Sequence, residues 1–562
     1  MYIIIPGGNL ILKTSRIFRI FMMALDTVIL FLLRPFRRFT KLFSFKHDGG
    51  SLEDTPHAVE ETRPERLGIK PELEVDGSPV TDFKREKPIN MPYGEKYSER
   101  DGIPTFRGDN LRSGGSFGTC DMSEKKLEVE WSVDTGRLKK GYGSGYWTGS
   151  GWTGQPLIAR WSNEEKSHMN LSDAAKADDS FTEVIYSTMD GKVYFLDLKT
   201  GERTRDEIEV GLPFKGAGAL HPSLPILHLG PGDSGPDKVK DYARAYLYSL
   251  TDQSKLLEYG GGPDPFAIRV FHGFDSSPIF DKLTDTLIEP AENGILYTMR
   301  LNSSFDENGN INIDPSEVVK LRYTTSRSSE EKYWLGMEDS AVVFKNFIYI
   351  ADNGGNLMCI DLNTMKVIWA QDVADDTNGS PVFSVEDGVP YIYIATSLHW
   401  KASRLFKLGD VPIFKINAIT GQYVWIRKYL CNTVAGISGG IQATCVCGAG
   451  SISDLVIFPV ARTPQVRSGR LVALDKKTGE EVWKLKMRRY AWSSPVAVYD
   501  KKGNAAIVIG DCEGRLMLVD GRTGKVLDSI ELGANIEATP AVYGDTIVVG
   551  TRGQKIFAIK IK

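Results

Sequence analysis

One pattern recurs along most of this 562-residue chain: a β-branched strand, a glycine turn, a second strand, then an acid followed by Thr-Gly and an aromatic residue. Clear copies begin at Val184, Phe347, Pro412, Gly469 and Ala506, and a weaker copy begins at Ala245. The strands alternate apolar and polar residues with a period of two, which predicts a hairpin and a turn in each copy. Folds built by repetition are therefore the first to consider for this chain.

A second marker precedes each hairpin: a small or polar residue with a proline, or its remnant, ahead of an apolar strand. Repeats of about 40–50 residues with four strands each are typical of β-propeller blades. Eight markers therefore predict an all-β, eight-bladed β-propeller, in which the longer intervals hold loop insertions. The markers are Gln155-Pro156, His221-Pro222, Ser277-Pro278, Ser340-Ala341, Ser380-Pro381, Ala443-Thr444, Ser494-Pro495 and Thr539-Pro540.

The last copy is too short to make a complete blade. It supplies "TIVVG" and "KIFAIKIK" but no outermost strand, and an unpaired strand edge invites aggregation. Ahead of the first complete copy, "KKLEVEWSVDTGR" holds an outer strand and a turn with no inner strands before them. We therefore predict that residues 127–133 complete the eighth blade and close the ring, within a propeller that spans residues 101–562.

The stretch Ala473-x-Asp475-x-x-Thr478-Gly479-x-x-x-Trp483 is similar to the tryptophan-docking repeat of pyrroloquinoline-quinone (PQQ)-like β-propeller proteins. Residues 102–115 also resemble the Phe-Arg-Gly lead-in often found before such propellers. The resemblance implies that tryptophans dock between neighbouring blades while Thr-Gly makes the turn. Members include quinoprotein dehydrogenases, a lipoprotein scaffold of outer-membrane assembly and many surface proteins, so the resemblance implies a fold more sharply than an activity. The implied docking residues are Trp131, Trp369, Trp425 and Trp483.

In propellers, the segment before the first strand of each blade usually faces the central axis. Brought together on one axis, the eight segments of this chain predict an acidic funnel with aromatic walls, which suits a cation, a sugar or a peptide. Asp and Asn also cap turns for local reasons, so a set of structural turn residues is the alternative. The candidate ligand-binding residues are Trp152, Gln155, His221, Asp275, Glu338, Asp339, Asp376, Asn378, Gln442, Trp492 and Glu537.

No pattern in the sequence predicts a metal site or a catalytic group. The stretch "DENGNINIDPSE" has the acid spacing of a calcium loop, but Ile311 stands where that loop needs glycine, so an Asn-Gly hairpin tip is preferred. The six cysteines are interpreted as buried small hydrophobes. Quinoprotein dehydrogenases commonly carry adjacent cysteines, whereas here a valine separates Cys445 from Cys447. This departure counts against a quinone site.

The N-terminal segment differs from the rest of the chain. Residues 20–33 form an apolar run with one charge, Asp26, and basic residues on both sides. The run is shorter than the ~20 residues of a spanning helix, so an uncleaved signal anchor and a helix lying on the membrane both stay open for residues 1–46. In either case we expect a membrane anchor. Residues 47–100 are rich in Pro and charged residues without an apolar period, which predicts a disordered linker.

The two indications of membrane side disagree. The heavier basic cluster follows the apolar run, which would place the propeller in the cytoplasm, whereas the resemblance implies an extracytoplasmic domain. A net charge of −4 gives no sign of nucleic-acid binding. We expect a monomeric, membrane-tethered propeller of the cell envelope that binds a protein, peptide or glycan through its acidic, Trp-lined axial face, without a cofactor. The alternative is a dehydrogenase that uses PQQ and calcium at the same axial acids.

Overall fold

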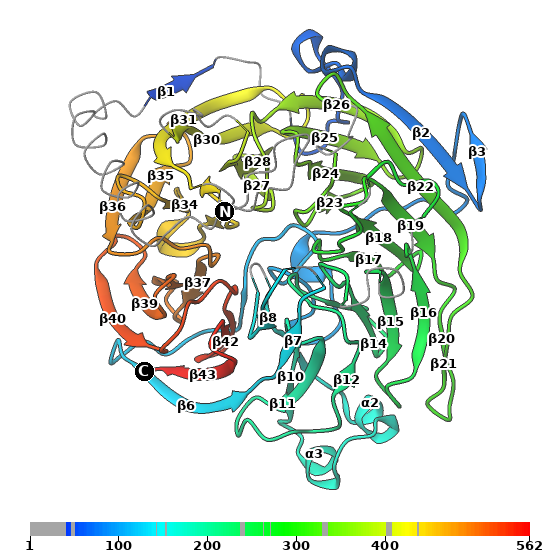
Figure 1. Ribbon diagram of the computed structural model, residues 1–562, viewed down its shortest axis with the longest axis vertical. Helices are drawn as coiled ribbons and strands as arrows, with labels where there is room; N and C mark the ends of the chain where they lie inside the picture. Colours follow the sequence, from blue (N-terminus) through cyan, green and yellow to red (C-terminus); the bar gives the residue numbers. More distant parts are fainter. Residues whose placement is uncertain are drawn as a thin grey trace.

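Eight sheets surround a central axis in this computed structural model, which describes residues 41–45, 51–141, 143–151, 154–235, 242–261, 264–269, 271–328, 335–400, 407–434 and 438–562. Each sheet runs from an inner strand near the axis to an outer strand at the rim (Figure 1). The predicted all-β, eight-bladed β-propeller is therefore confirmed.

The blades follow one another in chain order, and within each blade neighbouring strands pair antiparallel. The first is β9 (Leu157–Arg160), β10 (Thr182–Ser187), β11 (Lys192–Asp197) and β12 (Ile208–Glu209); the second is β13 (Ala219–Leu220), β14 (Ile226–Leu229), β15 (Ala245–Ser249) and β16 (Lys255–Tyr259); the third is β17 (Ile279–Asp281), β18 (Thr286–Pro290), β19 (Leu296–Arg300) and β22 (Ser316–Thr324); the fourth is β23 (Val342–Phe344), β24 (Phe347–Ala351), β25 (Asn356–Asp361) and β26 (Lys366–Asp372).

The second half of the ring repeats this arrangement. The fifth blade is β27 (Val382–Glu386), β28 (Val389–Ala395), β30 (Leu408–Asn417) and β31 (Tyr423–Asn432); the sixth is β33 (Val446–Cys447), β34 (Leu455–Ala461), β35 (Gly469–Asp475) and β36 (Glu481–Met487); the seventh is β37 (Val496–Tyr499), β38 (Ala505–Gly510), β39 (Arg515–Asp520) and β40 (Val526–Glu531); the eighth is β41 (Ala541–Tyr543), β42 (Thr546–Thr551), β43 (Lys555–Ile561) and β6 (Leu127–Asp134).

Insertions decorate several blades. They comprise the helices α2 (Asn163–His168) and α3 (Asp173–Ala177) between β9 and β10, and the hairpins β7 (Arg137–Lys139)–β8 (Tyr146–Thr148) and β20 (Ser304–Phe305)–β21 (Ile311–Asn312). The short strands β29 (Ser397–Leu398) and β32 (Gly439–Gly440) extend the sixth sheet toward the fifth blade.

The ring closes through β6, as the sequence predicts. This strand pairs antiparallel with β43, from Leu127 opposite Ile561 to Asp134 opposite Lys555. The eighth blade therefore takes its outer strand from a segment that precedes the first blade. Trp131 on β6 then reaches the first blade, where its indole N–H donates to the carbonyl of Leu198 at 3.0 Å.

The other three docking tryptophans repeat this contact. Trp369, Trp425 and Trp483 each donate an indole hydrogen bond of 3.0–3.1 Å to a main-chain carbonyl in the Thr-Gly turn region of the next blade. The turn glycine is needed for two reasons, shown by Gly479: its φ is +73°, and a Cβ there would stand 2.8 Å from the Trp425 ring. The repeat motif thus describes a blade-to-blade joint rather than a ligand site.

Hydroxyl groups in the markers of the third to seventh blades, called the hydroxyl ring below, form a hydrogen-bonded series that explains the small residue in these markers. The backbone N–H of Ser277 donates to the hydroxyl of Ser340 in the next blade, and Ser340 donates in the same way to Ser380. The series continues from Ser380 to Thr444 and from Thr444 to Ser494, with all four distances between 2.8 and 3.0 Å. A small hydroxyl residue at this level therefore links one blade to the next.

Residues 102–117 cross the axis beside this hydroxyl ring and contact the blades around it; we call them the plug. The plug begins as β4 (Gly102–Ile103), paired with β9, and ends as β5 (Ser116–Phe117), paired parallel with β41. Between them, Arg107 donates to the carbonyls of Pro495 and Cys445 at 2.6 and 2.8 Å. The Phe-Arg-Gly lead-in is thus an internal brace.

Arg112 braces the opposite side of the ring. Its guanidinium donates to the carbonyls of Ala341 at 2.9 Å and Ser277 at 2.6 Å, and also to Thr105 and Phe106 within the plug. Both arginine side chains are buried, with 1% or less of their surface exposed. Burial lowers the pKa of Arg112 to about 10, so the guanidinium keeps its charge at neutral pH.

The predicted disordered linker at residues 47–100 is wrong for residues 51–100. Strand β2 (Lys70–Val75) pairs with β22 and extends the third sheet, and β3 (Ser78–Val80) pairs with β2. The sparse apolar residues Ile69, Ile89 and Met91 are buried against the third and fourth blades. The amino-acid composition led to a wrong prediction of disorder because this segment packs onto an existing sheet edge and needs no hydrophobic core of its own.

The predicted membrane anchor, residues 1–46, lies outside the described residues apart from residues 41–45. Within that part, β1 (Lys41–Ser44) pairs antiparallel with β31 at the rim of the fifth blade. None of the helices within the described ranges is long and apolar enough to cross a membrane.

We predict that Arg112→Met lowers the free energy of unfolding by about 3 kcal/mol or more. Methionine keeps an apolar stem but leaves several buried carbonyls without donors, and hydrogen bonds to a charged group contribute about 1.5–3 kcal/mol each. Chemical denaturation followed by tryptophan fluorescence measures the change. The exposed Arg488→Met is the matched control and should unfold with the wild-type midpoint; equal midpoints for all three proteins would contradict the brace.

Candidate functional site

Three acidic side chains meet near the axis, on the third and fourth blades. Asp275 precedes β17, Glu292 lies in the turn between β18 and β19, and Glu338 precedes β23. One carboxylate oxygen from each lies within 4.8 Å of the others. Oxygens at this separation fit around one cation of calcium size, whose ligands lie 2.3–2.6 Å away. We call these three residues the acidic cluster.

Two cationic side chains border the acidic cluster without neutralising it fully. Lys215 Nζ lies 3.7 Å from Asp275 Oδ2 and 3.9 Å from Asp233 Oδ2. Arg269 Nη1 lies 3.6 Å from Glu292 Oε2. The separations exceed those of a direct hydrogen bond. Asp275 Oδ1 and Glu292 Oε1 are buried and accept no hydrogen bond from an N–H or hydroxyl group of the described residues. The Asp275 and Glu292 carboxyl groups hydrogen-bond each other, so a cation that displaced the proton between them would reach both oxygens.

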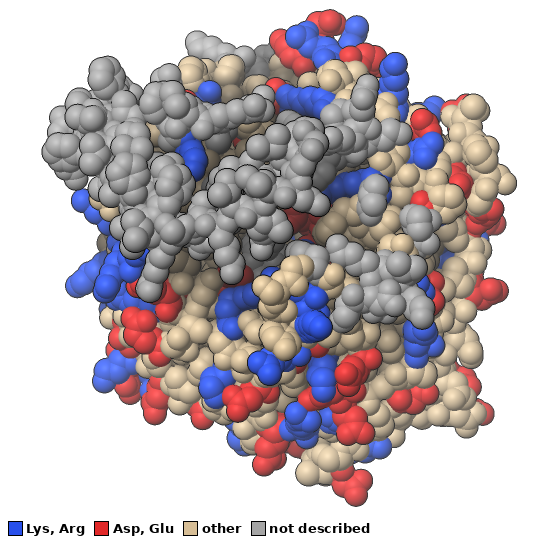
Figure 2. Space-filling view, in the orientation of Figure 1, with Lys and Arg blue, Asp and Glu red and all other residues tan. Residues whose placement is uncertain are grey.

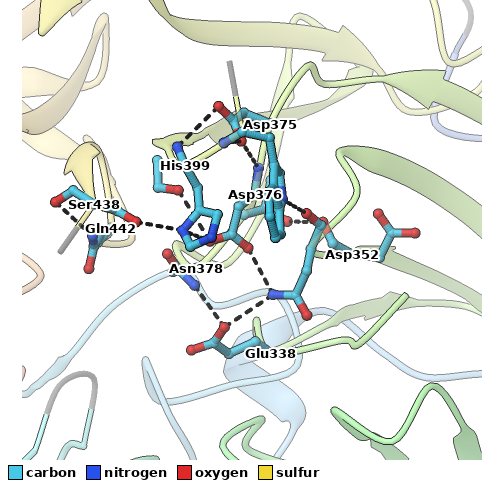
Figure 3. Close-up of polar contacts among 12 residues, drawn as sticks. Glu338, Asp352, Asp375, Asp376, Asn378, His399, Ser438 and Gln442 are labelled. Carbon is cyan, nitrogen blue, oxygen red and sulfur yellow. Dashed lines mark hydrogen bonds and ion pairs between the residues drawn. The ribbon is translucent and has the colours of Figure 1, made fainter. Parts of the chain in front are cut away.

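Amide side chains connect Glu338 to a second pair of acids on the fifth-blade side. Asn353 Nδ2 donates to Glu338 Oε2 at 3.1 Å and to Asp376 Oδ1 at 2.8 Å, and Asn378 Nδ2 donates to Glu338 Oε2 at 2.8 Å. Figure 3 shows Glu338, Asn378 and Asp376 facing one another, with Asp375 behind Asp376. These bonds fix the Glu338 carboxylate beside the acidic cluster.

The buried acids hold protons more tightly than usual. Burial raises the pKa of Glu338 to about 8, and the carboxylates of Asp376 and Asp275 add to the shift. Burial also raises the pKa values of Asp275, Glu292 and Asp376. Burial alone would lower the pKa of Lys215, but the surrounding carboxylates, Asp275 first, raise it. At neutral pH the site therefore combines a charged lysine with a Glu338 carboxyl group that retains its proton, and a bound cation would displace that proton.

His399 and Ser438 lie next to these acids but do not form a catalytic triad. His399 Nδ1 lies 2.8 Å from Ser438 Oγ and 4.0 Å from Asp376 Oδ2 (Figure 3). A triad needs the serine and the acid on opposite ring nitrogens, whereas here both face the same one. The arrangement can bind and orient a ligand, but it does not supply an activated nucleophile.

The structure brings together four of the predicted axial residues: Asp275, Glu338, Asp376 and Asn378. Gln442 lies at the edge of this group, where its amide donates to the carbonyl of Ser438 at 3.3 Å. These five residues come from the third to sixth blades.

The remaining predicted residues lie elsewhere or outside the described ranges. Gln155 belongs to the plug contact, because its carbonyl oxygen accepts from the backbone N–H of Arg107 and its amide donates to Pro540. His221 pairs with Asp285 at 3.1 Å between the second and third blades. Glu537 accepts from Asn535 at 2.6 Å. Trp152 is outside the described residues.

Two further predicted residues, Asp339 and Trp492, lie outside the acidic cluster. Asp339 is 1% exposed, and burial raises the pKa of its carboxyl well above the usual range, with the Asp352 carboxylate adding to the shift. Trp492 packs against Tyr490 with ring centroids 5.5 Å apart. The predicted funnel included residues from all eight blades, whereas in the structure the acidic side chains that lie together come from one side of the axis.

Sequence reasoning missed Glu292, Asn353, Lys215, Arg269 and His399. A usable signal exists for the first two, because each lies in the turn between the second and third strands of its blade, in "PAENG" and "ADNGG". That turn ends at the same face as the segment before the first strand. Lys215 lies in the short link between β12 and β13, directly before the predicted axial segment of the second blade, whereas Arg269 and His399 lie on longer insertions that no repeat pattern places.

The calcium-like stretch at residues 306–317 is a hairpin tip, as the sequence favours. The Asp306 carboxylate accepts from the backbone N–H groups of Asn308 and Asn310 at 2.9 and 2.8 Å. Glu317 turns instead to the backbone N–H of Glu86 at 2.8 Å. None of the six cysteines, all of which lie in the described ranges, forms a disulfide, and four of them are buried.

Known proteins resemble this chain in parts. Residues 467–562 match the PQQ_2 family model, described as outer membrane protein assembly factor BamB. Outer membrane protein assembly factor BamB of Kangiella koreensis is 24% identical over 218 residues, which cover 38% of this chain and 48% of that protein. Quinoprotein ethanol dehydrogenase of Pseudomonas aeruginosa is 26% identical over 171 residues, which cover 30% of this chain and 26% of that protein. The chain thus spans about half the length of the first relative and about a quarter of the second.

A solved structure shares the fold. A quinohemoprotein alcohol dehydrogenase of Pseudomonas putida HK5 superimposes with a TM-score of 0.53 and 12% identity, over 82% of this chain and 80% of that one. Such low identity shows the fold alone. Together these matches confirm the resemblance of this chain to PQQ-like β-propeller repeat proteins.

We predict that Glu338→Gln becomes more stable relative to wild type as pH rises. The folded pKa of Glu338, about 8, lies above the ordinary value of 4.5, so between these pH values the unfolded chain releases a proton that the folded chain retains. Wild type therefore loses stability as pH rises through this window, whereas the glutamine variant has no such proton.

Thermal unfolding of both proteins at pH 5, 6, 7 and 8 tests this expectation. The exposed Glu480→Gln serves as control, and its difference from wild type should stay constant across the series. A difference between Glu338→Gln and wild type that does not change with pH would contradict the raised pKa.

Proposed function

We propose that this chain is a β-propeller binding module of the cell envelope whose acidic cluster receives a cationic group of its ligand. The proposal rests on two buried oxygens, Asp275 Oδ1 and Glu292 Oε1, that receive no hydrogen bond from an N–H or hydroxyl group of the described residues. Buried polar atoms normally have a partner, and an unpaired carboxylate oxygen attracts a cation most strongly. A ligand supplying that charge would satisfy both atoms.

Charge supports a cationic ligand rather than an anionic one. The acidic cluster and Asp376 supply four carboxyl groups, and Lys215 and Arg269 supply two positive charges. Burial is the main cause of the shift of the Glu338 pKa to about 8, and the neighbouring carboxylates of Asp376 and Asp275 add to it. A metal ion, an ammonium or a guanidinium group would each relieve it.

Binding, rather than catalysis, suits the other polar groups. His399 and Ser438 are not arranged as a base and nucleophile with an orienting acid. The assembly-factor name of the Kangiella koreensis relative supports a protein partner and an envelope location. Membrane tethering through residues 1–46 remains part of this proposal.

The second candidate is a dehydrogenase that uses PQQ and calcium, favoured by the similarity to a quinoprotein ethanol dehydrogenase. The donor set of the acidic cluster fits calcium, which prefers carboxylate oxygens. The fit to the quinone is poorer. Cys445 and Cys447 are not adjacent in sequence, and the Cys445 carbonyl binds the plug arginine, Arg107. In such an enzyme the quinone would accept the electrons, and the acidic cluster would hold the metal.

We predict that calcium chloride or tri-arginine raises the melting temperature of the full chain. A ligand at 100 times its dissociation constant adds about 2.7 kcal/mol to the folded state. The shift should disappear in Asp275→Asn/Glu292→Gln and persist in Asp306→Asn/Asp500→Asn, which removes two surface acids. No shift with either probe, or equal shifts in both variants, would contradict the proposed site.

Adding PQQ separates the two candidates. Dye reduction with an alcohol substrate that requires PQQ and calcium together, and that the double variant loses, would favour the dehydrogenase. Cation binding without dye reduction would favour the binding module.

A further inference from the structure

Positive charge concentrates on the outer strand of the sixth blade. Strand β36 exposes Lys484 and Lys486, with Lys477 in the turn before it and Arg488 after its end. Figure 2 shows Lys and Arg side chains gathered at the rim over β36. Lys484 pairs with Glu481, but among the described residues Lys477, Lys486 and Arg488 form no ion pair. On a chain of net charge −4, this local excess needs an explanation.

Exposed apolar side chains adjoin these charges. Phe43 and Phe45, at and beyond β1, are 43% and 45% exposed, and Val482 on β36 is 46% exposed. Lys428 Nζ lies 5.2 Å from the centre of the Phe43 ring. Leu42 reaches the turn of the sixth blade, because a Cβ on Gly479 would stand 3.0 Å from its Cδ1. Strand β1 therefore lies where the fifth and sixth blades meet.

The outer strands of the two following blades do not share this charge. Strand β6 of the eighth blade exposes Glu128, Glu130 and Asp134, and β40 of the seventh exposes Glu531. Lysines on a free strand edge commonly prevent pairing between molecules, but that need applies to every blade of the ring. Exposed basic side chains on the first, second and fourth blades, such as Arg203, Lys255 and Lys366, are paired with acids, so the positive charge along β36 that no acid of the described residues pairs indicates a partner on that side.

The sequence before β1 limits how far this rim can lie from the predicted apolar segment. The apolar run ends at Leu33, and β1 begins at Lys41. Eight extended residues span at most about 28 Å. The intervening residues include Arg34, Arg37 and Arg38, which continue the positive charge.

We infer that the rim of the fifth and sixth blades docks against an anionic lipid surface. The docking surface, called the basic rim below, consists of Phe43, Phe45, Lys428, Lys477, Val482, Lys484, Lys486 and Arg488. Basic groups are attracted to the headgroup potential while aromatic side chains enter the interface. The propeller then stands on its edge, and the axial site, on which this inference does not depend, faces sideways along the membrane.

Lysine footprinting of the full chain tests the orientation. The protein is reconstituted in nanodiscs of phosphatidylcholine alone or with 30% phosphatidylglycerol, and acetylation is measured at each lysine. We expect Lys477, Lys484 and Lys486 to label at least threefold more slowly in the anionic discs. Lys199 and Lys255, on the first and second blades, should label equally in both.

Charge reversal provides the matched control. In Lys484→Glu/Arg488→Glu the protection of Lys477 and Lys486 should be lost, and 0.5 M sodium chloride should abolish it in wild type. In Lys199→Glu/Arg203→Glu the protection should persist. Equal labelling of the basic rim in both lipids, or protection of Lys199 equal to that of Lys486, would overturn the inference.

Discussion

Two buried arginines on one short segment hold the centre of this propeller together. Arg107 and Arg112 donate to main-chain carbonyls from four different blades. Each carbonyl belongs to, or adjoins, the marker ahead of an inner strand, where the hydroxyl ring also lies. An inner strand near the axis has few neighbouring strands. Because each arginine hydrogen-bonds to more than one blade, the two side chains together set the separation between the inner strands.

That brace also determines which acids can form a site. The markers are fixed at one level, so residues two to four positions earlier converge next to it, as Asp275, Glu338 and Asp376 do. The blades differ in what they place there. The third to fifth supply carboxylates, whereas the first supplies Gln155, which is already engaged by the plug. The eight blades are alike in fold, but the acidic site therefore lies on only one side of the axis.

The blade repeat could be predicted from the sequence because its residues make the same local contact at each joint between blades. Trp483 and Gly479 recur with their spacing since each joint has the same geometry. The closing strand, predicted at residues 127–133, followed from counting strands and is observed as β6. The acidic site could be predicted only in part. Glu292 and Asn353 lie in turns whose direction follows from the blade, but Arg269 and His399 come from insertions that no periodicity fixes. Residues 51–100 escaped prediction because their order depends on a sheet edge supplied by the third blade.

The closing pair has a consequence for how the chain is made. Glu128 and its partner Lys562 are 434 residues apart, and β43 cannot pair with β6 until the ribosome has delivered both. At about 5–20 residues per second, β6 exists for roughly 20–90 seconds before its partner is synthesised. During that time the exposed Val129 and the unpaired edge of β6 are open to chaperones or to another chain. The acidic residues Glu128, Glu130 and Asp134 along this strand give it charge repulsion against such premature pairing.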